Sequence, residues 1–96
     1  MSAQPDIVMY TTVHCPYCLR AEKILRARGA NEIKKLRIDL DPDLRDEMTE
    51  KTSRRTVPQI FIGGRYIGGC EELIDFDRAG RLQPLLSGEP DPLETP

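Results

Sequence analysis

Two cysteines, Cys15 and Cys18, stand three positions apart where a short apolar run, residues 7–10, gives way to a helical pattern. At that spacing both thiols fall within the first helical turn, close enough to alternate between a dithiol and a disulfide. A helix start offers unpaired backbone N–H groups and the positive end of the helix dipole, and both stabilise a thiolate. Because the thiolate is the attacking species in thiol–disulfide exchange, we predict a redox site with Cys15 as nucleophile and Cys18 as the better shielded resolving thiol.

Other uses of a C-x2-C pair fit this sequence less well. A structural zinc site needs a second pair of ligands, and the remaining Cys and His residues are Cys70 and His14. His14 directly precedes Cys15, an awkward geometry for chelation together with the same pair. A structural disulfide would close only a small loop, and packing alone gives no reason for this spacing at a helix start. We therefore expect no metal here.

The composition is that of an ordinary soluble domain, with 39% hydrophobic and 31% charged residues in a chain of 96. A net charge of −2 without a basic cluster argues against nucleic acid as a principal partner. The first six residues carry no basic segment and no apolar run approaches a membrane span, so we expect neither a signal peptide nor a membrane partner. Three cysteines are too few for a secreted disulfide framework, which predicts a cytoplasmic protein, with a monomer as the default.

The first half of the chain predicts a strand–helix–strand unit. Residues 7–10 are typical of a central strand buried on both faces, and Pro16 suits the first position of the helix that Gly29 ends. Residues 33–40 alternate between apolar and charged side chains, which predicts an edge strand with Leu40 on its apolar side. The two strands should be parallel, joined by a right-handed crossover.

A second helix and a hairpin follow. Asp41 is placed as the N-cap of a mostly charged surface helix that fades near Thr52. Residues 59–62 form a compact apolar strand, Gly63-Gly64 is a hairpin turn signal, and residues 65–67 form the returning strand. Together these elements predict a strand pair beside the first unit.

The remaining residues predict a helix and a tail. Cys70 begins a helix with acidic residues in its first turn, Gly80 ends it, and residues 82–86 add a last short apolar piece. We therefore expect one α/β domain over residues 1–88, with a four-stranded mixed sheet (a βαβ half and a ββα half) flanked by three to four helices. Residues 89–96 carry three prolines and three acids and predict a disordered acidic tail.

Three motifs, in this order and spacing, resemble those of the bacterial dithiol glutaredoxins, which have a thioredoxin fold. The motifs are Cys15-Pro16-Tyr17-Cys18, Thr56-Val57-Pro58-Gln59-Ile60-Phe61-Ile62 and Ile67-Gly68-Gly69-Cys70-Glu71-Glu72-Leu73. A C-x2-C pair alone is a weak signal, but the three motifs together are strong, and the resemblance spans residues 5–87. It implies a glutathione-dependent disulfide oxidoreductase.

The resemblance also implies a role for each cysteine. Cys15 would attack a glutathionyl or protein disulfide, Cys18 would resolve protein mixed disulfides, and free glutathione, as co-substrate, would restore the reduced form. The implied partners are disulfide-bearing or glutathionylated proteins, with ribonucleotide reductase and oxidatively stressed thiol proteins as family-level candidates.

A glutathione-binding groove is implied as well. Pro58 matches a cis-proline that would present the backbone of Val57, so that glutathione pairs with it as a short antiparallel strand. Tyr17 and Thr56 match positions that line the groove.

The γ-glutamyl end of glutathione would lie at the start of the last helix, where Gly69, Cys70 and Glu71 match the family. Backbone N–H groups at a helix start suit the carboxylate of this end, and an acidic side chain suits its ammonium. From the residues alone, Gly68-Gly69 could be only a turn and Glu71 only an acid that compensates the helix dipole.

Several positions depart from the family pattern or have no assigned role. Thr12 stands where many relatives carry a lysine that helps to hold the thiolate, which leaves this task to the helix start and to Arg20 or another arginine. Glu71 replaces a common aspartate. We interpret His14 as an exposed loop residue, and Cys70 as a tolerated small residue that could be oxidised or glutathionylated but is dispensable for turnover.

Two other function classes remain open. In an iron–sulfur carrier, two subunits would ligate a cluster with their leading cysteines and two glutathiones, but relatives that bind clusters usually have small residues where Pro16 and Tyr17 stand. A thioredoxin-like protein that a flavoprotein reduces, without glutathione, would not need the groove motifs.

Overall fold

The computed structural model describes residues 4–89, and the tail predicted for 89–96 lies outside this range except for Glu89. The strands are β1 (Ile7–Thr11), β2 (Lys34–Arg37), β3 (Gln59–Ile62) and β4 (Arg65–Gly68). The helices are α1 (Pro16–Ala27), α2 (Pro42–Thr52), α3 (Cys70–Arg78) and α4 (Leu82–Leu86). The α/β fold with a four-stranded mixed sheet is therefore as the sequence predicts.

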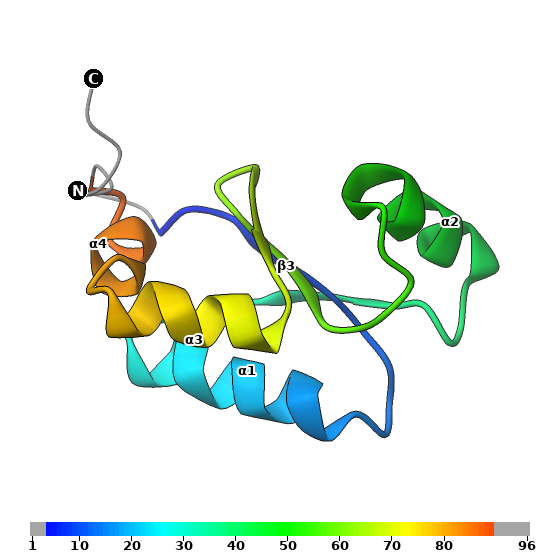
Figure 1. The fold of residues 1–96 in the computed structure, drawn as a ribbon, viewed down its shortest axis with the longest axis horizontal. Coiled ribbons are helices and arrows are strands. Elements are labelled where there is room, and N and C mark those ends of the chain that lie inside the picture. Colours follow the sequence, from blue (N-terminus) through cyan, green and yellow to red (C-terminus); the bar gives the residue numbers. More distant parts are fainter. Residues whose placement is uncertain (1–3, 90–96) are drawn as a thin grey trace.

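The sheet has the strand order β2-β1-β3-β4. β1 pairs in parallel with β2 and antiparallel with β3, and β3 pairs antiparallel with β4. Figure 1 shows α1 and α3 side by side on one face of the sheet and α2 on the other. The predicted central position of the first strand and the edge position of the second are both confirmed.

Alternate residues of β1 face two different cores. Ile7 and Met9 belong to the larger core beneath α1, α3 and α4, where Leu25 and Leu73 are fully buried. Tyr10 faces the smaller core under α2, which also contains Ile38 and Met48, and its hydroxyl donates a hydrogen bond to Glu47 of α2. Because successive side chains of β1 point to opposite faces of the sheet, this one strand packs against the helices on both faces.

Polar and glycine residues mark where several helices and strands begin or end. The Asp41 side chain caps α2 by accepting the Asp43 N–H at 3.0 Å. Gly63 and Gly64 turn β3 into β4 with φ of 59° and 80°, the positive values that a tight two-residue hairpin requires. These local signals were sufficient to place the corresponding boundaries from the sequence.

The predicted strand over residues 33–40 is wrong at both ends, because β2 covers only Lys34–Arg37. The chain turns directly after Arg37, with the Leu40 N–H bonded to the Arg37 carbonyl at 3.2 Å. Two hydrogen bonds of 2.7 and 2.6 Å between Arg37 and Asp39 close this turn. Leu40 is consequently 72% exposed and does not face the core.

Replacement of Leu25 by alanine tests the larger core. Leu25 is 0% exposed, so the lost contacts and the cavity should lower the free energy of unfolding by about 2–5 kcal/mol. Leu40→Ala is the matched control at an exposed site and should change it by less than about 0.5 kcal/mol. Urea unfolding followed by circular dichroism measures both, and equal effects would contradict the placement of the two leucines.

Candidate active site

The end of β1 and the start of α1 place the two cysteines of the C-x2-C motif. Cys15 is the N-cap residue of α1, with extended backbone angles, and Pro16 occupies the first helical position. Both thiols are free, with Cys15 8% and Cys18 3% exposed. The structure therefore sets the predicted nucleophile at a helix N-terminus and the predicted resolving thiol one turn inside.

The Cys15 sulfur has two polar neighbours. The backbone N–H of Cys18 donates to Sγ of Cys15 at 3.1 Å, so the sulfur serves as the side-chain cap of α1. The Val57 carbonyl oxygen lies 3.9 Å from the same sulfur, within reach of a weak S–H···O hydrogen bond. An N–H aimed at Sγ at the positive end of a helix stabilises negative charge on that sulfur.

Cys18 lies one turn further into α1 and is the more buried of the two thiols. Burial, together with its hydrogen bond to Cys15, raises the pKa of the Cys18 thiol to about 11, although contacts with Thr11 and Thr12 act in the other direction. Cys18 therefore remains a thiol at neutral pH. Two cysteines one helical turn apart thus differ in both hydrogen bonding and burial.

A groove of about 200 Å³ begins beside Val57. The sequence predicts seven glutathione-binding residues, and this groove is lined by all of them: Tyr17, Thr56, Val57, Pro58, Gly69, Cys70 and Glu71. The Val57–Pro58 peptide bond is cis, as the resemblance implies. Three further lining residues, Arg54, Gln59 and Glu72, were not predicted as site residues.

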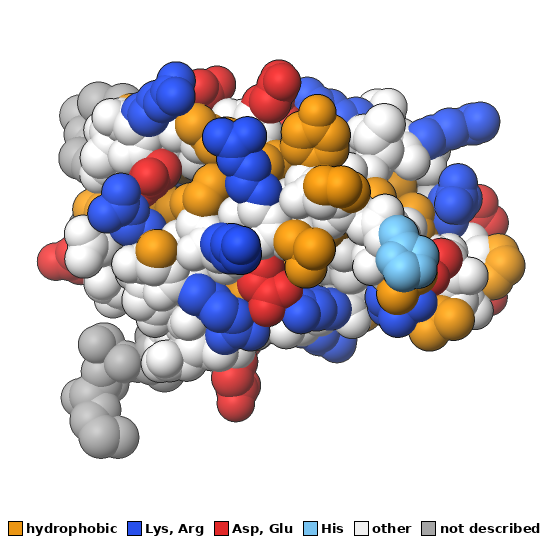
Figure 2. All heavy atoms as spheres, turned by 90° about the horizontal axis from the view of Figure 1, so that it is seen from below, with side chains coloured by type: hydrophobic (Ala, Val, Ile, Leu, Met, Phe, Trp, Pro, Cys, Tyr) orange, Lys and Arg blue, Asp and Glu red, His pale blue; other side chains and the backbone are white. Residues whose placement is uncertain are grey.

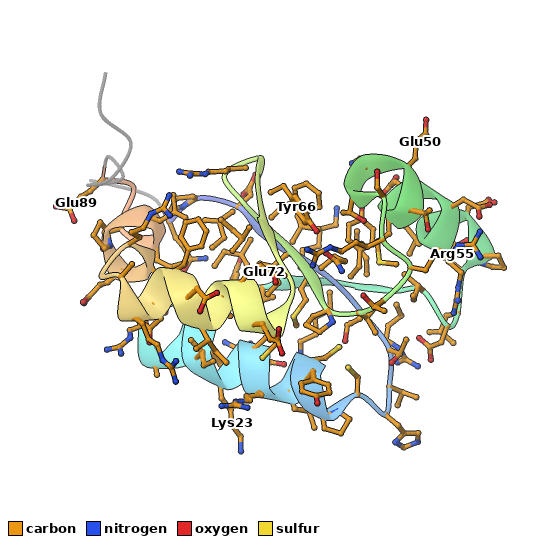
Figure 3. All side chains as sticks on the ribbon, viewed as in Figure 1. Lys23, Glu50, Arg55, Tyr66, Glu72 and Glu89 are labelled. Carbon is orange, nitrogen blue, oxygen red and sulfur yellow. The ribbon has the colours of Figure 1, made fainter. Side chains whose placement is uncertain are left out.

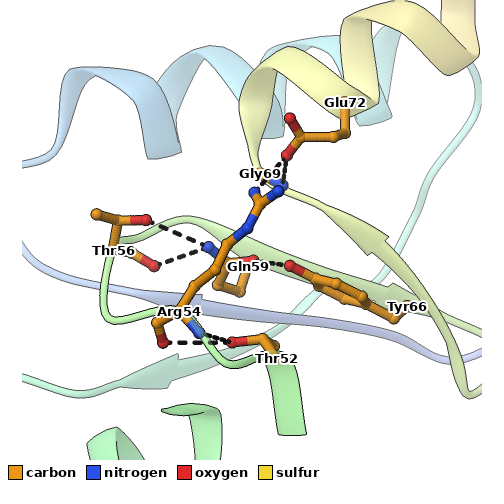
Figure 4. A network of polar contacts seen from close by, with 7 residues as sticks. All are labelled: Thr52, Arg54, Thr56, Gln59, Tyr66, Gly69 and Glu72. Atoms are coloured by element: carbon orange, nitrogen blue, oxygen red, sulfur yellow. Dashed lines mark hydrogen bonds and ion pairs between the residues drawn. The ribbon is translucent and has the colours of Figure 1, made fainter.

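Gln59 holds the wall of the groove that contains the cis bond. Its amide nitrogen donates to the carbonyl and hydroxyl oxygens of Thr56 at 3.0 and 3.4 Å, and its amide oxygen accepts from the Tyr66 hydroxyl at 2.6 Å (Figure 4). Gln59 is 1% exposed. A buried, fully engaged amide of this kind fixes the loop before β3 against β4.

Two glycines form the opposite wall at the start of α3. Gly68 has φ of 122°, and a Cβ there would lie 2.7 Å from atoms of the Glu72 side chain. A Cβ on Gly69 would lie 3.1 Å from the Pro58 carbonyl oxygen. Gly69 is therefore more than a turn residue, because its missing side chain lets the start of α3 approach the Pro58 carbonyl, and Gly68 leaves room for the Glu72 side chain.

The other residues singled out in the sequence take different positions. Glu71 is exposed at the groove rim, and Cys70 is buried, with burial raising its thiol pKa. His14 is exposed on the surface, as interpreted from the sequence (Figure 2). Thr12 lines a separate recess of about 190 Å³ together with Cys15 and Cys18.

A larger hollow of about 1010 Å³ lies at the opposite end of β1 from Cys15. It is lined by residues 4–8, 26 and 31–34. Its lining is remote from the thiols, so it is not the site of their chemistry. Among residues 4–89, no helix combines the length and apolar character that crossing a membrane requires.

Comparisons with known proteins agree with this arrangement. The glutaredoxin family model matches residues 7–67. The chain is 45% identical over 83 residues to a glutaredoxin of Pseudomonas aeruginosa, covering 86% of this chain and 98% of the relative. It is 43% identical over 81 residues to glutaredoxin 3 of Escherichia coli, covering 84% and 96% of the two chains.

Solved structures show the same relationship. The solution structure of a glutaredoxin from Brucella melitensis superposes with a TM-score of 0.77 at 42% identity, covering 88% of this chain and 90% of the other. A buckwheat glutaredoxin–glutathione complex superposes with a TM-score of 0.80 at 32% identity, covering 88% and 78%. By the family model and by these relatives and structures, the chain belongs to the glutaredoxin family of the thioredoxin superfamily.

Proposed function

We propose that this protein is a glutathione-dependent thiol–disulfide oxidoreductase that reduces glutathione mixed disulfides and protein disulfides. One observation carries the proposal: the capped sulfur of Cys15 adjoins the carbonyl of Val57, at the end of a groove lined by all seven residues expected to bind glutathione. The buckwheat relative, whose structure is a complex with glutathione, supports the same ligand.

For a glutathionylated protein, the Cys15 thiolate attacks the glutathione sulfur of the mixed disulfide. A bond forms between Cys15 and glutathione, the original disulfide bond breaks, and the protein thiolate leaves and takes up a proton. The thiolate of a second glutathione then attacks the bound glutathione sulfur and regenerates the Cys15 thiolate. The two glutathiones leave as glutathione disulfide, so the electron pair comes from glutathione.

For a protein disulfide, Cys15 first forms a mixed disulfide with the substrate. Cys18 loses its proton, attacks Cys15 and releases the reduced protein, leaving a disulfide between the two cysteines. Two glutathiones reduce that disulfide in turn. Because the raised pKa keeps Cys18 protonated, it does not compete with Cys15 for the first attack.

The groove offers complementary chemistry for each part of glutathione. The backbone of Val57 can pair with the extended tripeptide, as in strand addition. The first backbone N–H groups of α3 have no partner within the helix and suit the γ-glutamyl carboxylate. The exposed carboxylate of Glu71 at the rim suits the ammonium group of the same end.

The partner and compartment are part of this proposal. Glutathionylated or disulfide-bearing proteins, with ribonucleotide reductase among the candidates, would meet the exposed surface around Tyr17, which is 61% exposed. The cytoplasm is the proposed location because the cycle needs reduced glutathione.

Serine replacements at the two cysteines test the mechanism. In an assay with a glutathionylated peptide, glutathione, glutathione reductase and NADPH, Cys15→Ser should reduce turnover by on the order of 10³-fold or more, because it removes the nucleophile. Cys18→Ser should retain turnover of this substrate but lose reduction of a protein disulfide. Absence of glutathione-dependent turnover in the wild type, or retained turnover in Cys15→Ser, would refute the assignment.

The pH dependence of Cys18 alkylation tests the raised pKa of this thiol. Only the thiolate reacts, and burial keeps the Cys18 pKa well above neutrality, so the rate in Cys15→Ser should rise about tenfold per pH unit between about pH 7 and 9. Iodoacetamide labelling with peptide mass spectrometry separates Cys18 from Cys70. A rate that levels off below about pH 8 would show an unshifted or lowered pKa.

A further inference from the structure

Arg54 and Glu72 join the two walls of the groove. Nη1 of Arg54 lies 2.7 Å from Oε1 of Glu72, and the same oxygen accepts the backbone N–H of Gly69 at 2.7 Å (Figure 4). Arg54 precedes the wall with the cis-proline, whereas Gly69 and Glu72 belong to the wall at the start of α3. A single carboxylate oxygen therefore connects segments 18 residues apart.

The backbone of Arg54 is itself anchored to α2. Its N–H donates to Oγ1 of Thr52 at 3.0 Å, and that hydroxyl donates to the Met48 carbonyl at 2.7 Å. Met48 is fully buried in the smaller core. The arginine side chain thus extends toward α3 from a fixed point and not from a free loop.

The Glu72 side chain is held equally well. It folds back over Gly68, where a Cβ would lie 2.7 Å from three of its atoms, and it caps the N-terminus of α3 through Gly69. The Gly69 N–H and the Arg54 guanidinium both lower the pKa of Glu72, so its carboxylate is ionised at neutral pH. The ion pair therefore exists under the conditions in which glutathione would bind.

We propose that Arg54 and Glu72 are a positioning pair that sets the spacing between the walls of the glutathione groove. This inference rests on the proposed function. The walls already approach closely at Gly69 and Pro58, so a small shift at the pair changes the separation between the backbone of Val57 and the start of α3. Both segments must contact the same tripeptide at once.

The pair also decides which donors a ligand can use. Because Glu72 occupies the Gly69 N–H, a bound carboxylate would take the N–H groups of Cys70 and Glu71, which lie in the first turn of α3. Arg54 offsets the negative charge of Glu72 at this position. The side chains of Arg54 and Glu72 are 46% and 36% exposed, and pairs this exposed contribute little to global stability.

The test compares Arg54→Met, Glu72→Gln, the double variant and Arg54→Lys in the glutathionylated-peptide assay. Each single change should raise the KM for glutathione about two- to fivefold, the effect an exposed ion pair can supply, with kcat and Tm unchanged. The double variant should match the single variants, and Arg54→Lys should restore the wild-type KM. Arg55→Met is the matched control, because Arg55 is exposed and lies beside α2, away from Glu72 (Figure 3).

Two results would overturn the positioning role. An unchanged KM in both single variants would show that the pair does not act on binding. An effect of Arg54→Met that persists in the Glu72→Gln background would show that Arg54 contacts glutathione directly.

A second measurement does not depend on turnover. In the ligand-free protein, Arg54→Met should shift the amide resonance of Gly69, whereas Arg55→Met should leave it in place. If the wild type lacks activity but this shift is seen, the proposed function fails and the pair still joins the walls. If the wild type is active and the shift is absent, the positioning role fails alone.

Discussion

The hydrogen bond from the Cys18 N–H to the Cys15 sulfur is the interaction on which the site depends. Helix N-caps are usually oxygen-bearing side chains, but here a sulfur caps α1 at 3.1 Å. The group that completes the helix is therefore the proposed nucleophile, and a helix start that needs an acceptor is also suited to stabilise negative charge on that sulfur. Pro16 at the first helical position leaves no N–H of its own to satisfy.

The site also depends on segments that are distant in the sequence. The chain brings the loop before β3 and the start of α3 against the start of α1, and Gly69 lets the backbone at the start of α3 approach the Pro58 carbonyl. Gln59 fixes one wall from the buried side, while Glu72 fixes the other from the exposed side.

The sequence predicts most of this fold because the signals are local. A buried run, a proline after Cys15 and paired glycines place strands, helix starts and turns without tertiary information. Residues 33–40 mislead because the chain turns at residues 38–40 although the alternating pattern continues to Leu40. The seven groove residues were predicted from the family resemblance. Arg54 and Glu72 were not predicted, because nothing in the sequence indicates that two opposite charges 18 residues apart form an ion pair.

Thr12 leaves Cys15 without the nearby lysine that many relatives carry at this position. A lysine at this position would supply a mobile, strongly hydrated charge beside the thiolate, and its field would weaken with added salt. Here the Cys15 sulfur instead has a fixed backbone N–H at 3.1 Å, whose effect does not depend on a flexible side chain. The charged side chains that line the groove are Arg54, Glu71 and Glu72. In the proposed binding mode, the γ-glutamyl end of glutathione, which carries both an ammonium and a carboxylate, would meet these charged side chains, whereas the sulfur of glutathione would meet Cys15.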